Sequence, residues 1–100
     1  MLIIEFTEHG QCVADLKTDQ WVDDIIKSTD FNIITEIQVG TSVMIDSFRV
    51  AVKENKINSL DIVFKFEDQL IVCNPFGKIG FWPKGFCDTT MINLAKLAKN

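Results

Sequence analysis

The stretch 59–67, SLDIVFKFE, decides the fold, because it has the cleanest alternation of apolar and polar side chains in the chain. Its apolar face is formed by Leu60, Ile62, Phe64 and Phe66. A period of two over this length predicts a half-buried β-strand. The same period recurs in residues 31–39, FNIITEIQV, where alternate positions are Phe31, Ile33, Thr35, Ile37 and Val39. A sheet is therefore the central element that the sequence predicts.

Further strands are expected on both sides of these two. Residues 2–8 and 11–16 predict a hairpin around His9-Gly10, since glycine tolerates the backbone of a tight turn. Residues 43–53 predict a strand with Phe48, Val50 and Val52 facing inward and a bulge near Asp46-Ser47. Residues 70–73 are a short apolar run typical of a central strand, which Pro75 ends.

Two helices are predicted. The first begins at Thr18 or Asp19 as N-cap, ends near Ser28–Asp30, and has the apolar stripe Trp21, Val22, Ile25 and Ile26. The second follows Asp88 or Thr89 and has the stripe Met91, Leu94, Ala95 and Ala98. The predicted order is ββαβββ(β)α. We therefore expect a single α+β domain over residues 1–100, with a mainly antiparallel sheet of about five or six strands and two helices packed on one face.

Composition and charge exclude several classes of function. The chain has 100 residues, is 47% hydrophobic and has a net charge of −4, which excludes a disordered tail. An acidic surface argues against duplex nucleic acid or an anionic membrane as the main partner. The start of the sequence does not resemble a secretion signal, and no apolar run approaches the length of a membrane span. Three cysteines cannot all pair, which favours reduced thiols and a cytoplasmic location.

The charge is unevenly distributed along the chain. Residues 1–50 have nine acidic and three basic residues, whereas residues 51–100 have five acidic and seven basic residues. We therefore expect a non-enzymatic protein-binding module, an inhibitor or immunity-type protein that neutralises a basic protein such as a nuclease toxin. The candidate partner-binding residues are Asp19, Trp21, Asp23, Asp24, Asp30 and Trp82. The competing interpretation is that these acids only keep the protein soluble.

A second hypothesis concerns residues 75–87, PFGKIGFWPKGFC, which interleave aromatic rings with lysines and contain no acid. Such a segment can stack single-stranded bases and pair with their phosphates. The candidate nucleic-acid-binding residues are Phe76, Lys78, Phe81, Trp82, Lys84 and Phe86. The same rings could instead form a contact for a protein partner or close one end of the core.

A third hypothesis is a metal or thiol site formed by His9, Cys12, Cys73 and Cys87. Only His9 and Cys12 are close in sequence, whereas a structural zinc site usually takes its ligands as close pairs. Cysteines inside predicted strands are more often small core residues. The glycines of residues 75–87 do not match a dinucleotide or phosphate-binding motif. We therefore predict no cofactor and no catalytic residue.

Overall fold

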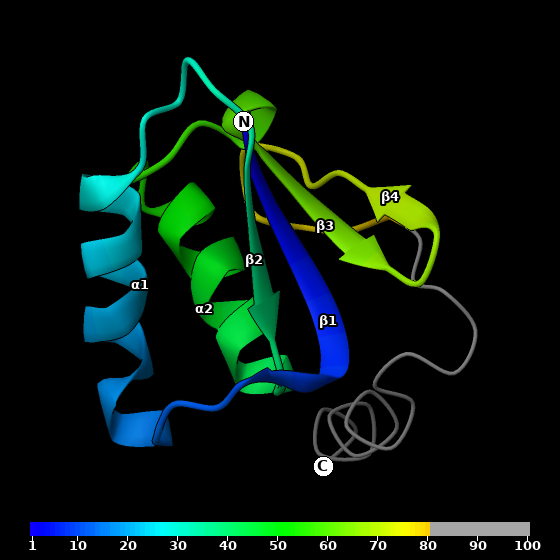
Figure 1. Cartoon of the computed structure of the whole chain (residues 1–100). Coiled ribbons are helices and arrows are strands. Elements are labelled where there is room, and N and C mark those ends of the chain that lie inside the picture. Colours follow the sequence, from blue (N-terminus) through cyan, green and yellow to red (C-terminus); the bar gives the residue numbers. More distant parts are fainter. Residues whose placement is uncertain (81–100) are drawn as a thin grey trace, which may run out of the picture.

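The computed structural model describes residues 1–80. The chain forms an α+β fold with one four-stranded mixed sheet and two helices (Figure 1). The elements in chain order are β1 (Leu2–Gln11), α1 (Thr18–Ser28), β2 (Thr35–Val39), α2 (Ser42–Lys53), β3 (Ile62–Phe66) and β4 (Gln69–Ile71). Short 3-10 turns, η1 (Asp15–Lys17) and η2 (Ser59–Asp61), precede α1 and β3. The helix predicted after Asp88 lies outside the described residues.

The predicted antiparallel sheet is only partly correct. The strand order is β2-β1-β3-β4, and β1 runs parallel to both of its neighbours. Only β3 and β4 are antiparallel, joined through Glu67-Asp68. Within residues 1–80 the sheet has four strands, fewer than the five or six expected. Parallel pairing arises because a helix, and not a hairpin, connects β1 to β2 and β2 to β3.

Helices α1 and α2 cover the same face of the sheet (Figure 1). The sequence instead predicts the helix after Asp88, and not residues 42–53, beside α1. In the sheet, β2 lies on one side of β1 and β3 lies on the other side. The connection from β1 to β2 therefore runs in one direction across the sheet, and the connection from β2 to β3 runs in the opposite direction and passes over β1. Because both helices lie on one face, these two crossovers have opposite hands, whereas the right-handed form strongly predominates in proteins.

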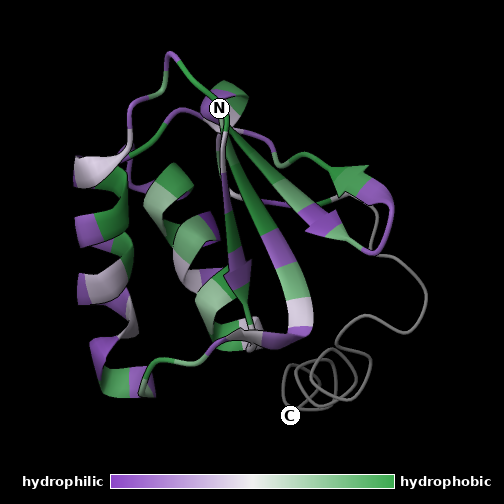
Figure 2. Cartoon of the chain, viewed as in Figure 1, coloured by the Kyte–Doolittle hydropathy of each residue, from purple (hydrophilic) through white to green (hydrophobic). Residues whose placement is uncertain are grey.

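Helix α1 forms where the sequence predicts it. Val22 on the predicted apolar stripe is buried, and Trp21, Ile25 and Ile26 pack against the core. Figure 2 shows the resulting division of α1, with its apolar side toward the rest of the fold and its polar side outward. The predicted N-cap is wrong by one or two positions, because the cap is Lys17, which makes no side-chain cap hydrogen bond.

Helix α2 replaces the strand predicted at residues 43–53. Thr41 caps it by accepting a hydrogen bond from the Met44 amide at 3.2 Å. The buried residues recur at helical spacing, and they are Met44, Ile45, Phe48, Ala51 and Val52. Val50, predicted to face inward, is 48% exposed, and no bulge exists at Asp46-Ser47, which lies within the helix.

The predicted first hairpin is also absent. Strand β1 continues through His9 and Gly10 to Gln11, and its pairing with β2 shifts between Phe6 and Gln11, which both oppose Val39. Leu16, expected inside a second strand, is fully exposed within η1. The strand predicted at 70–73 exists as β4, but it is an edge strand and not a central one.

The core lies between the sheet and the two helices. It is formed by the inward positions of β1 and β3, Leu2, Ile4, Ile62 and Phe64, together with the buried residues of α1 and α2. On the opposite face of the sheet, Lys65 on β3 pairs with Glu5 at 3.4 Å and Glu36 at 3.8 Å. Across residues 1–80, neither helix has the length and apolar composition required to cross a lipid bilayer.

Candidate functional site

Two of the predicted partner-binding acids point from α1 toward α2. The Ser47 hydroxyl donates a hydrogen bond to Asp19 Oδ1 at 3.1 Å. Lys56 Nζ forms an ion pair with Asp23 Oδ1, also at 3.1 Å. Hydrogen bonding to Asp23, and then to Glu54, raises the pKa of the Lys56 ammonium. Both acids therefore lie along the seam between the two helices.

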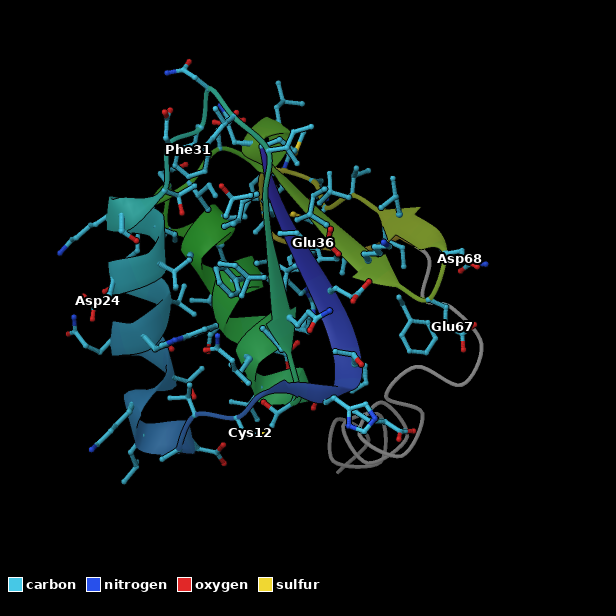
Figure 3. The ribbon with its side chains drawn as sticks, viewed as in Figure 1. Cys12, Asp24, Phe31, Glu36, Glu67 and Asp68 are labelled. Atoms are coloured by element: carbon cyan, nitrogen blue, oxygen red, sulfur yellow. The ribbon has the colours of Figure 1, made fainter. Side chains whose placement is uncertain are left out.

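The other two predicted acids lie away from that seam. Asp24 is exposed on the outer side of α1, where it accepts a hydrogen bond from Gln20 Nε2 at 2.9 Å (Figure 3). Asp30 follows the helix and accepts a hydrogen bond from the Asn32 amide at 2.9 Å. The structure thus brings Asp19 and Asp23 together and leaves Asp24 and Asp30 as separate exposed charges.

The predicted aromatic anchors are not confirmed. Trp21 packs its ring edgewise on Phe48, with the ring centroids 5.8 Å apart and the planes at 78°. It is half-buried and packs against the core, so only part of its ring is open to a partner. Trp82 lies outside the described residues.

Sequence reasoning missed the residues that complete the site around Asp19 and Asp23. Val50 is exposed between the helices, and Glu54 lies beside it. We define the acidic groove as Asp19, Asp23, Ser47, Val50, Glu54 and Lys56. Three carboxylates, one ammonium and the apolar Val50 line this hollow, which measures only about 30 Å³. If residues 42–54 had been interpreted as a helix, their spacing would have placed Val50 and Glu54 together on an exposed face. The period of two in Phe48, Val50 and Val52 favoured a strand and so concealed the helical spacing.

The predicted nucleic-acid-binding residues fall partly within the described chain. Phe76 and Lys78 line a hollow of about 270 Å³ together with Asp46, Arg49, Val50, Lys53 and Gly77. We call this hollow the basic pocket, because it has three cations and one carboxylate. Phe81, Trp82, Lys84 and Phe86 lie outside the described residues. Arg49 and Lys53 were missed because they were placed on a strand.

A third hollow lies where β3 ends and its pairing with β1 stops, at Phe6 and Phe66. It measures about 540 Å³ and is lined by Glu8, His9, Glu67 and the Phe6–Phe66 ring pair, among others. The carboxyl ends of parallel strands are a common place for ligands to bind. We call it the acidic hollow, and Figure 3 shows its residue Glu67 on the side of the molecule opposite to Asp24.

The predicted metal or thiol residues do not converge within residues 1–80, where no three histidine, cysteine or acidic side chains are placed to hold a metal ion. Cys12 is exposed after β1, whereas Cys73 is buried in the core. Burial raises the pKa of the Cys73 thiol above its ordinary value of 9.0, and a backbone hydrogen bond and the Arg49 charge oppose this shift without cancelling it. Cys87 lies outside the described residues.

These two environments predict different thiol reactivities. At pH 8, iodoacetamide should alkylate Cys12 at least about tenfold faster than Cys73, because the thiolate is the nucleophile and Cys73 is both buried and protonated. Mass spectrometry of the separate peptides measures each rate. In 8 M urea the two rates should converge, and equal rates in the native protein would contradict the burial of Cys73.

Helix α2 contributes to two neighbouring hollows of opposite charge. The acidic groove lies toward α1, the basic pocket lies toward the loop 74–78, and the two adjoin at Val50, which lines both. Comparisons of the chain with protein-family models, curated proteins and solved structures found no match. The arrangement can bind charged partners in either hollow.

Proposed function

We propose that the protein is a non-enzymatic binding module that neutralises a basic protein partner through the acidic groove, in the manner of an inhibitor or immunity protein. The observation that supports this most directly is that the exposed Val50 lines the same hollow as Asp19, Asp23 and Glu54. An apolar centre inside a charged rim is the usual anatomy of a protein interface. The partner surface that complements it has an apolar side chain flanked by arginines or lysines.

One cation of the protein itself, the Lys56 ammonium, pairs with the acids of the groove. Lys56 pairs with Asp23 and with Glu54, at 3.1 and 3.3 Å, and its side chain is 42% exposed. Exposed ion pairs contribute little to stability, so a basic group of a partner can replace this lysine at low cost. Arginine suits the exchange best, because its planar guanidinium donates to two carboxylates at once.

The charge of the described chain favours the same class of partner. Residues 1–80 have thirteen acidic and seven basic residues, a net charge of −6. A field of this sign accelerates the approach of a basic protein and competes with nucleic acid for its basic site. Asp24 and Asp30 contribute to this long-range attraction although they lie outside the groove.

Charge reversal in the groove tests the proposal. The variant Asp19→Lys/Asp23→Lys/Glu54→Lys should weaken binding of the basic partner at least about 100-fold, because like charges then face each other across the interface. The partner is identified by affinity capture from the host and quantitative mass spectrometry. Its affinity is then measured by calorimetry with the purified protein at 50 and 300 mM salt.

The matched control is Glu8→Lys/Glu67→Lys/Asp68→Lys, which changes the net charge equally near the acidic hollow. It should weaken binding less than about tenfold, through long-range attraction alone. Circular dichroism verifies that both variants are folded. Loss of binding in the control but not in the groove variant would move the interface to the acidic hollow, and capture of no basic protein would refute the proposal.

A further inference from the structure

The loop 74–78 beside α2 is a rigid structure built by its own hydrogen bonds. Asn74 Oδ1 accepts from the backbone amides of Phe76 and Lys78, at 2.9 and 3.0 Å. The Asn74 amide donates to the Lys78 carbonyl, and the Gly77 amide donates to the Asn74 carbonyl. These bonds fix the conformation from which Phe76 and Lys78 project.

The loop is also anchored to α2. Arg49 Nε donates to the Gly77 carbonyl at 2.8 Å, while Arg49 Nη1 pairs with Asp46 at 3.0 Å. Gly77 has a φ of +75°, and a Cβ atom built on it would lie 2.2 Å from the Arg49 carbonyl oxygen. Only glycine permits this approach, so the loop and the helix form a single platform.

The platform presents an unusual combination of exposed groups. The Phe76 side chain is 68% exposed, which leaves a large ring in contact with solvent. Lys53 and Lys78 are exposed on the same hollow, and within residues 1–80 neither forms an ion pair. The pocket therefore has a local excess of positive charge on a chain segment whose net charge is −6.

We propose that the basic pocket binds single-stranded nucleic acid, with one base stacked on Phe76 and adjacent phosphates on Lys53 and Lys78. An exposed ring stacks on any base, and nearby lysines neutralise the backbone. Arg49 pairs with Asp46 and supports the loop, so it acts as a positioning residue. Duplex bases are stacked on each other and cannot reach the ring. The basic pocket adjoins the acidic groove at Val50, but Phe76, Lys53 and Lys78 do not line the groove.

Fluorescence anisotropy with a labelled 12-nucleotide oligothymidine tests the stacking contact. The unmodified protein should bind at 20 mM salt, and Phe76→Leu should weaken this binding about five- to hundredfold, because the stacking surface is lost. Phe76→Trp should restore it, since tryptophan offers a larger ring. The same sequence in a duplex should bind more weakly than the single strand.

The salt dependence tests the lysines. The slope of log K against log salt should fall by about 1.4 in Lys53→Gln/Lys78→Gln, at about 0.7 for each lost phosphate contact. The matched control Lys17→Gln/Lys27→Gln removes the same charge from η1 and α1 and should leave the slope unchanged. The proposal is overturned if oligothymidine does not bind, if Phe76→Leu binds as tightly as the unmodified protein, or if both double variants change the slope equally.

Discussion

Replacing Phe48 by alanine should lower the free energy of unfolding by about 3–5 kcal/mol. Phe48 is fully buried in the middle of α2 and contacts the Trp21 ring of α1. The substitution leaves a cavity between both helices and the sheet, and the surrounding side chains fill it only partly. A domain of this size has a stability of about 5–15 kcal/mol, so the variant should melt at least about 12 °C lower.

Phe76→Ala is the matched control, because it removes the same atoms from a side chain that is 68% exposed. Its melting temperature should stay close to that of the unmodified protein. Urea unfolding followed by circular dichroism measures both variants, and Phe48→Leu gives a milder value if the alanine variant does not fold. Equal losses in the two alanine variants would contradict the packing of α2 described above.

Replacing Gly77 by alanine should cost about 2–4 kcal/mol, from the left-handed backbone and from the clash of the new methyl group with the Arg49 carbonyl. The loop must then move away from α2. Because Cys73 and Ile79 of the same segment are buried in the core, their packing is lost with it. Urea unfolding measures the stability, and iodoacetamide measures the accessibility of Cys73, which should rise.

Gly80→Ala is the control for the same chemical change. A Cβ atom added to Gly80 would meet no heavy atom within 4 Å, so its replacement by alanine should change the free energy of unfolding by less than about 0.5 kcal/mol. If Gly77→Ala were equally neutral and left Cys73 protected, the anchoring of the loop on α2 would be wrong. The same variant would then also remove the structural basis of the basic pocket.

The pKa of Cys73 adds a pH dependence to this stability. Because burial raises it in the folded state, the folded protein holds the thiol proton more tightly than the unfolded chain does. Cys73 therefore makes its full contribution to the free energy of unfolding below the ordinary thiol pKa of 9.0. This contribution declines as the pH rises from 9.0 through the higher pKa that Cys73 has in the folded protein.

Local patterns correctly predicted the elements whose spacing has one interpretation. The alternation around Phe64 specifies β3 from Ile62 onward, although Leu60, predicted on its apolar face, lies in η2 and is 80% exposed. The stripe containing Val22 specifies α1. The same reasoning failed for α2, which contains four β-branched residues, Val43, Ile45, Val50 and Val52. These residues favour strands, and Phe48, Val50 and Val52 also match a period of two. Met44, Ile45, Phe48 and Ala51 recur instead at helical spacing, and the packing of these four side chains in the core overrides the local preference for a strand.

The candidate site shows the same limit. The sequence identified the acids of α1 and the aromatic-basic character of residues 76–78. It could not show that Asp23 meets Lys56, which is 33 residues away, or that Arg49 meets Gly77, which is 28 residues away. It also could not show that Trp21 is covered and Val50 is exposed, because exposure depends on which segments pack together.

The sequence by itself therefore determined the α+β class, helix α1, strand β3 and the uneven distribution of charge. These properties depend on residue types and on spacings shorter than one element. Only the tertiary structure decided the parallel pairing of β1 with β2 and β3, the helical state of residues 42–53 and the two charged surfaces beside α2. Each of these depends on contacts between segments far apart in the chain, where burial of apolar area outweighs local preference.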